Sequence, residues 1–113
     1  MKRYLGKKIR LKIYIDNQDK YKGSPLWEEL LKRVKDEGLA GATVTKAVAG
    51  VGAFSQIHTQ SLIALSDKLP LVVEIIDDEQ KIEDFIKSVD EMIEEGLVTL
   101  DDVEVINYKK RGV

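Results

Sequence analysis

The chain has 113 residues, of which 43% are hydrophobic and 34% are charged, and its formal net charge is −2. This length is that of one domain, so we expect a single domain over residues 1–113. The balance of 18 basic and 20 acidic residues gives no electrostatic case for binding nucleic acid or an anionic membrane surface. The absence of cysteine excludes disulfides and thiolate metal sites.

The apolar residues are dispersed along the chain rather than collected in one long run. No stretch approaches the 18 apolar residues of a membrane-spanning helix, so no membrane insertion is expected. Residues 1–8 are polar and basic and lack the apolar segment of a signal peptide. Together with the lack of cysteine, this predicts a cytoplasmic protein.

The first third of the chain predicts a strand followed by a helix. Apolar residues alternate with polar ones over residues 9–15, which is typical of a half-buried strand, whereas residues 16–23 are polar and predict a loop. Ser24 and Pro25 predict a helix start, because serine caps free N–H groups and proline fits the first helical position. Gly38 predicts the end of this helix, in a left-handed conformation.

The middle third predicts a second strand and a long connection. Residues 42–49 are rich in valine and threonine, and Gly50 and Gly52 would end the strand. Residues 54–68 are expected to connect it to the next strand, with a short helix over residues 59–65.

The last third repeats the order of strand, helix and strand. The nearly continuous apolar run of residues 71–76 predicts a central strand buried on both faces. Asp77 and Asp78 are expected to cap a second helix, and Gly96 to end it as Gly38 ends the first. A final strand is expected over residues 103–108. The apolar stripe of the second helix has a helical period and comprises Ile82, Phe85, Ile86, Val89, Met92 and Ile93.

This order of elements predicts an α+β fold of the ferredoxin-like β-α-β-β-α-β type. Right-handed crossovers would put both helices on one face of a four-stranded antiparallel sheet. The other face would lack a helix to cover it, so we expect oligomerisation to hide it.

Several motifs carry a resemblance to a known superfamily. The run Gly-Leu-Ala-Gly-Ala-Thr-Val-Thr over residues 38–45, followed by Gly-Val-Gly over residues 50–52, resembles the region around the second strand of the nitrogen-regulatory PII proteins. With Ile-His-Thr at residues 57–59 and Leu-Pro at residues 69–70, the chain resembles in particular a PII-like family, the domain of unknown function one-ninety, over residues 8–108.

The resemblance implies a PII-like signalling protein. Such a protein is a homotrimer that binds a small effector, here an adenine nucleotide (ADP or ATP), in clefts between subunits. It would signal through the loop after the second strand to a protein partner or a transporter. The resemblance implies that Gly41, Ala42 and Thr43 of one subunit bind the nucleotide, and that Gly50, Gly52 and Ile76 come from its neighbour, together with the turn at Gly96. It adds His58 and Arg111 to the nucleotide-binding residues.

The chain also departs from the PII pattern at the positions that meet phosphate. Ala53 and Phe54 stand where PII proteins carry arginine and glutamine, and the turn after the second helix lacks a phosphate-binding lysine. Asp101 and Asp102 follow there instead, and a bare acidic pair repels phosphate. The basic tail of residues 109–111, or a bound Mg²⁺ ion, would have to supply the positive charge.

Other functions remain open at this point. A trimer of the CutA type shares this fold and binds divalent metal, for which carboxylates and His58 would be the ligands; alternatively, His58 is a polar loop residue. Glu74 is a functional carboxylate, the partner of Lys12 or Arg10, or a residue exposed on an oligomer surface. An enzyme using the same clefts is a third reading. However, the sequence has no Gly-x-Ser-x-Gly elbow, no cysteine nucleophile and no phosphate loop, so we expect a regulator rather than an enzyme and assign no catalytic and no metal residue.

Overall fold

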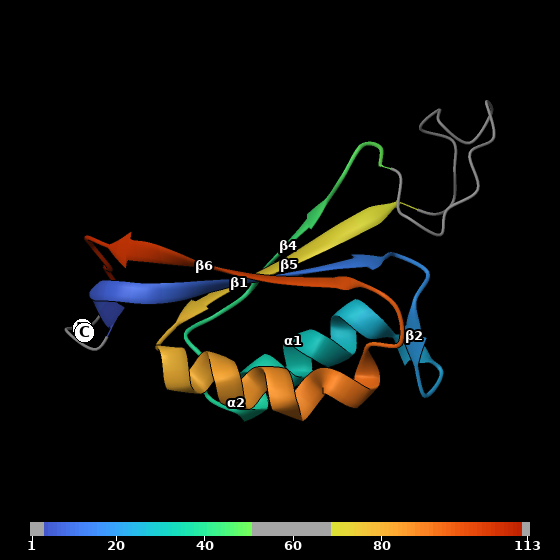
Figure 1. The fold of residues 1–113 in the computed structure, drawn as a ribbon, viewed down its shortest axis with the longest axis horizontal. Helices are drawn as coiled ribbons and strands as arrows, with labels where there is room; N and C mark the ends of the chain where they lie inside the picture. Colours follow the sequence, from blue (N-terminus) through green and yellow to red (C-terminus); the bar gives the residue numbers. More distant parts are fainter. Residues whose placement is uncertain (1–3, 51–68, 112–113) are drawn as a thin grey trace.

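The computed structural model describes residues 4–50 and 69–111. The strands and helices of these residues form two layers (Figure 1). In chain order the elements are β1 (Gly6–Asp16), β2 (Lys20–Tyr21), β3 (Ser24–Pro25), α1 (Leu26–Asp36), β4 (Thr43–Lys46), β5 (Pro70–Asp77), α2 (Glu79–Val89), the 3-10 helix η2 (Asp90–Met92) and β6 (Leu97–Val105).

Four of the strands form one antiparallel sheet with the order β4-β5-β1-β6. Both helices lie on the same side of this sheet (Figure 1). This order and this layering are those of the ferredoxin-like fold, so the fold class predicted from the sequence is confirmed. Strands β2 and β3 pair separately in a small hairpin. Strand β2 lies in the segment expected to be a loop, and β3 consists of the two residues expected to start the helix.

The core lies between the sheet and the two helices. Alternate residues of β1 and β5 point toward the helices, and each helix presents one buried stripe to them. Burying such side chains stabilises the fold by roughly 1.5–3 kcal/mol each. The buried apolar residues are Leu11, Ile13, Ile15, Leu26, Leu30, Val34, Leu71, Val73, Ile75, Ile82, Phe85, Val89 and Met92.

Strand β5 differs from the expectation that both of its faces are buried. Leu71, Val73 and Ile75 are buried against the helices, whereas the residues between them are only half-buried. An apolar run does not reveal which of its two faces is covered. We call the side away from the helices the open face; by alternation and register it carries Lys8, Arg10, Lys12, Tyr14, Thr43, Thr45, Val72, Glu74, Ile76, Leu97, Thr99, Asp101 and Val103.

Neither helix is capped by the side chain that the sequence suggests. The N-cap of α1 is Pro25, and Ser24 lies in β3 instead, so the predicted serine cap is wrong. The N-cap of α2 is Asp78, as expected, but its carboxylate makes no capping hydrogen bond. Both acidic side chains before α2 are instead held by other partners, which belong to the site below.

The two glycine stop signals have different outcomes. Gly38 has φ of +71°, its N–H donates to the carbonyl of Lys35, and the N–H of Leu39 donates to the carbonyl of Val34. This pattern is the predicted left-handed helix end. Gly96 has no left-handed conformation, since α2 and η2 end before it; a Cβ atom at Gly96 would lie 2.8 Å from the carbonyl oxygen of Tyr14. Because Gly96 has no side chain, the backbone just before β6 can approach β1 closely.

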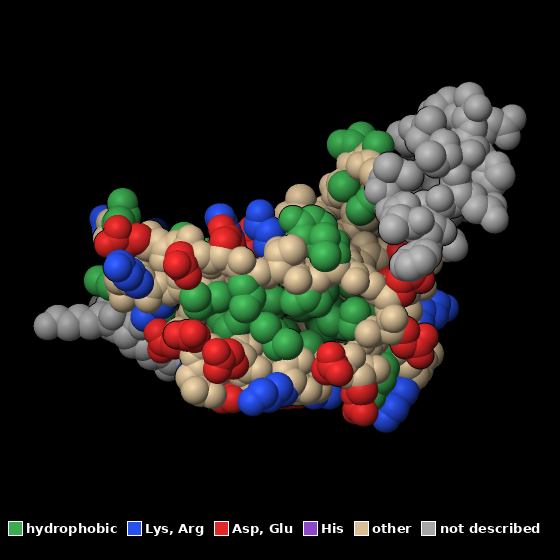
Figure 2. All heavy atoms as spheres, in the orientation of Figure 1, with side chains coloured by type: hydrophobic (Ala, Val, Ile, Leu, Met, Phe, Trp, Pro, Cys, Tyr) green, Lys and Arg blue, Asp and Glu red, His purple; other side chains and the backbone are tan. Residues whose placement is uncertain are grey.

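The last strand also begins earlier than predicted. Strand β6 spans Leu97–Val105 rather than residues 103–108, and β4 spans Thr43–Lys46 rather than residues 42–49. Because β6 is an edge strand, Leu97, Val98 and Leu100 are exposed. Figure 2 shows a band of apolar side chains between β6 and the helices.

The predicted helix over residues 59–65 lies outside the described residues. Among the helices that are described, none is long and apolar enough to cross a membrane.

Candidate functional site

A pocket of about 250 Å³ lies where β5 ends and β1 begins. It brings together Gly41, Ala42 and Thr43, before and at the start of β4, with Ile76 on β5 of the same chain. The resemblance implied instead that Ile76 would reach the nucleotide from the neighbouring subunit. Its other lining residues come from the two ends of the described chain, from the strands and from the connection between α1 and β4, and they are Tyr4, Lys8, Ala40, Glu74, Asp77, Val105 and Tyr108.

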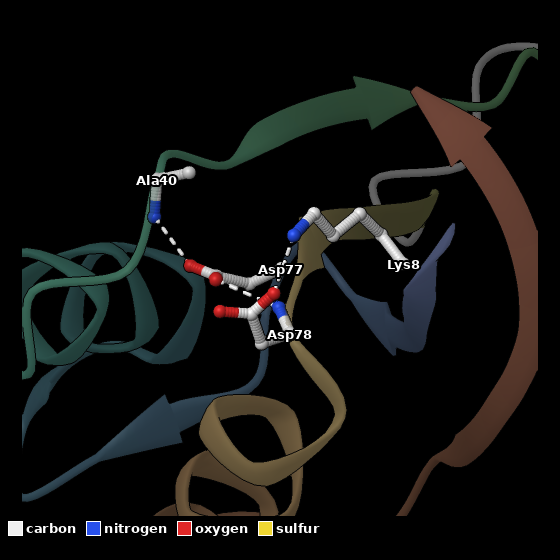
Figure 3. A network of polar contacts seen from close by, with 4 residues as sticks. All are labelled: Lys8, Ala40, Asp77 and Asp78. Atoms are coloured by element: carbon white, nitrogen blue, oxygen red, sulfur yellow. Dashed lines mark hydrogen bonds and ion pairs between the residues drawn. The ribbon is translucent and has the colours of Figure 1, made fainter. Parts of the chain in front are cut away.

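Asp77 fixes the shape of this pocket. This residue is 3% exposed, and its two carboxylate oxygens accept hydrogen bonds from the backbone N–H of Ala40 at 2.8 Å and of Asp78 at 2.7 Å (Figure 3). Buried carboxylates need such partners, because an unpaired one would lose its hydration without compensation. The bond to Ala40 ties the connection between α1 and β4 to the end of β5, so the backbone around Gly41 forms a fixed wall.

Lys8 is a pocket residue that the sequence analysis missed. Its side chain is 10% exposed, and its Nζ lies 2.5 Å from Oδ1 of Asp78, whose side chain is 46% exposed (Figure 3). Extending the alternation of β1 backward from Lys12 through Arg10 would have placed Lys8 on the open face. That periodicity is the one signal in the sequence that could have found it.

Two tyrosines close the pocket on the side of β6. The rings of Tyr4 and Tyr108 have centroids 4.6 Å apart and planes inclined by 33°. Stacked pairs of this kind contribute about 0.5–1.5 kcal/mol beyond their buried area. The pair joins the segment before β1 to the segment after β6, two segments whose proximity no local pattern indicates.

The remaining predicted residues are not gathered at this pocket. Gly96 lies beside Tyr14, at the other end of β1 from Lys8, and it lines a separate cavity of about 200 Å³ between β6 and α2. Gly50 lies close to the ring of Pro70, and Arg111 is exposed near the end of the chain. Gly52 and His58 lie outside the described residues.

Asp101 and Asp102 do not form the bare acidic turn after the second helix that was expected, because both lie within β6. Asp101 lies within β6, directly opposite Arg10 of β1, and the guanidinium of Arg10 donates two hydrogen bonds to its carboxylate. These hydrogen bonds lower the pKa of Asp101 and raise the pKa of Arg10. The negative charge of Asp101 is therefore neutralised by Arg10, which the β1–β6 register places directly opposite it.

Glu74 has a position consistent with two of its expected roles. It lies directly opposite Lys12 across the β1–β5 pair and lines the pocket from the open face. Within residues 4–50 and 69–111, no group of three or more histidine, cysteine, aspartate or glutamate residues is arranged to hold a metal ion.

The pocket thus combines an aromatic wall, a backbone wall and a few charged groups. Pockets that enclose a whole ligand usually have volumes of about 300–1,000 Å³, so this one can enclose only part of a nucleotide-sized molecule. Lys8, Thr43 and Glu74 of its lining lie on the open face of the sheet.

The family model and two relatives of this chain point to the same family. The family model DUF190, described as an uncharacterised ACR, matches residues 8–105. A UPF0166 protein of Aquifex aeolicus is 44% identical over 100 residues, covering 88% of this chain and 94% of its own. A UPF0166 protein of Methanocaldococcus jannaschii is 33% identical over 96 residues, covering 84% of this chain and 88% of its own.

Solved structures with the same fold are PII-like. The protein CPII of Thiomonas intermedia K12, bound to ADP and bicarbonate, aligns with a TM-score of 0.66 at 18% identity, covering 91% of this chain and 92% of its own. A putative PII-like signalling protein of Thermus thermophilus aligns with a TM-score of 0.62 at 19% identity, covering 90% of this chain and 92% of its own. At these identities the likeness establishes the fold alone.

Proposed function

Because this chain belongs to the DUF190 family and has a PII-like fold, we propose that it is a PII-like signalling protein and not an enzyme. Its effector is an adenine nucleotide, ADP or ATP, with or without Mg²⁺. The pocket formed by residues 40–43 and the end of β5 holds part of that nucleotide.

The observation that carries this proposal is the meeting of Gly41, Ala42, Thr43 and Ile76 around one pocket. These residues come from two separate segments of one chain, and the resemblance assigns all four to the nucleotide, although it places Ile76 on the neighbouring subunit. The fixed backbone wall around Gly41, tied to Asp77, is a preorganised surface of the kind that binds a ligand without a large ordering cost. CPII, which shares the fold, is described as bound to ADP.

The site is completed by a second copy of the chain in a homotrimer. A pocket of about 250 Å³ encloses less than a nucleotide, and Gly96 of the same chain is at the far end of β1. A heterologous contact repeated three times forms a closed ring and brings different surfaces of neighbouring copies together. The segment between β4 and β5 would then carry the signal to a protein partner or transporter.

Isothermal titration with ATP, ADP and AMP, each with and without Mg²⁺, tests the function. We expect saturable binding near one site per subunit, and the preferred nucleotide identifies the signal. Inosine diphosphate serves as a control for recognition of the base. If no nucleotide gives heat up to millimolar concentration, the proposal is wrong. Titration with Cu²⁺ and Zn²⁺ in the same series tests the metal-binding alternative.

A further inference from the structure

The positive charge of the pocket comes from one residue. Lys8 is the single lysine or arginine among the described residues that line it. The resemblance implies a phosphate-binding lysine in the turn after the second helix, where this chain has none. A cation within the site strengthens the binding of phosphate groups, and the basic tail of residues 109–111 is exposed and outside the pocket lining.

Lys8 is positioned to meet an anion. Its side chain is 10% exposed, so the ammonium group is held near the pocket rather than extended into water. The two carboxylates that line the pocket have other neighbours: Asp77 accepts two backbone N–H groups, and Glu74 faces Lys12 across the sheet. The carboxylate that pairs with Lys8 is Asp78, which lies outside the pocket lining.

The ion-pair partner of Lys8 is easily exchanged. The Asp78 side chain is 46% exposed, so its carboxylate keeps much of its hydration and can regain the rest when the ion pair opens. When a phosphate oxygen approaches Lys8, the Asp78 carboxylate can return to water at small cost. A lysine ammonium has three donors, so the exchange requires no movement of the strand.

We propose that Lys8 is the anion-binding residue of this pocket and that Asp78 is its competing counter-charge in the empty site. This inference rests on the proposed function in taking the anion to be the phosphate of an adenine nucleotide. Pyrophosphate has the same chemistry without the base, and adenosine has the base without the charge. The three probes therefore separate contributions of charge and base.

The test is titration of wild type, Lys8→Met and Asp78→Asn with ADP, adenosine and pyrophosphate. Methionine retains most of the apolar stem, and asparagine is as good an N-cap as aspartate. We expect Lys8→Met to weaken ADP and pyrophosphate by roughly ten- to hundredfold, the value of a charge-assisted hydrogen bond, with adenosine unchanged. Asp78→Asn should tighten both anions by about two- to fivefold, because it removes the competitor.

Lys7→Met is the matched control. Lys7 is the preceding residue of β1, it is exposed, and alternation points its side chain to the other face. It carries the same charge, so an effect of net charge alone would appear equally in both variants. We expect Lys7→Met to bind ADP like wild type.

The outcomes distinguish this inference from the proposed function. If Lys8→Met binds ADP and pyrophosphate as wild type does, Lys8 is not the anion-binding residue, while nucleotide binding stands. If wild type binds pyrophosphate through Lys8 but no ADP, the anion site is supported and the nucleotide proposal fails. If both variants weaken ADP and adenosine alike, the pair is only structural. If wild type binds neither anion, the inference is overturned.

Discussion

A single buried carboxylate connects the fold to the pocket. Asp77 ends β5, and its two hydrogen bonds join the α1–β4 connection to the start of α2. Substitution of Asp77 by asparagine replaces one acceptor by a donor, which then faces a backbone N–H group. Because an unsatisfied buried group costs about 1–3 kcal/mol, we expect Asp77→Asn to lower the free energy of unfolding by that amount and to weaken ADP binding. Urea denaturation and titration measure the two effects.

Asp102→Asn is the matched control for this variant. Asp102 is exposed on β6, and its substitution should change the free energy of unfolding by less than about 0.5 kcal/mol. If Asp77→Asn is as stable as Asp102→Asn, the bond to Ala40 does not hold the pocket wall.

At the scale of the elements, local patterns predicted most of the fold. The alternation in β1, the apolar stripe of α2 and the helix end at Gly38 all depend on neighbours within a few residues, and all are confirmed. The start of β6 was missed because its two acidic residues indicate a turn when read locally. Asp101 is accommodated in a strand by Arg10, which is 91 residues away in the sequence.

In the candidate site, too, features formed by one short segment were predictable from the sequence, whereas contacts between distant segments were not. A sequence motif predicted the wall around Gly41, because the motif itself forms that wall. The tyrosine pair was not predictable, since Tyr4 and Tyr108 meet only after the whole sheet has formed. Lys8 lies between these cases: its face follows from alternation, but its partner Asp78 follows only from the register of two strands.

The two helix-stop glycines provide a test at this scale. Asparagine tolerates the left-handed conformation, so Gly38→Asn should lower the free energy of unfolding by less than about 1 kcal/mol. At Gly96 any side chain meets the carbonyl oxygen of Tyr14, so Gly96→Asn should cost about 1–3 kcal/mol, as overpacking does. Thermal or urea denaturation of both variants compares them directly. Equal losses would mean that Gly96 is not required for the close approach of β6 to β1.

For the whole molecule, the open face of the sheet determines the expected assembly. Its residues form rows across the strands, and the row of Val72, Tyr14 and Leu97 is apolar. The next row pairs Glu74 with Lys12, and the one after it pairs Arg10 with Asp101. No helix among the described residues covers this face (Figure 1). An apolar row beside charged rows suits a specific contact between copies better than exposure to water, because the charges fix the register while the apolar row excludes water.

Lysine substitution at Val72 tests whether this face is the trimer interface. A lysine there would put an unpaired ammonium into a desolvated contact, which costs several kcal/mol per ion, and the symmetry of a trimer repeats that cost in all three copies. We expect light scattering to give a trimer mass for wild type and a smaller mass for Val72→Lys at micromolar concentration. Val48→Lys is the control, since Val48 is 78% exposed and follows β4 outside the sheet. Loss of ADP binding together with the trimer would support a shared site. If Val72→Lys remains trimeric, or if wild type is a monomer, the open face is not the interface, and the pocket must then bind its ligand within one chain.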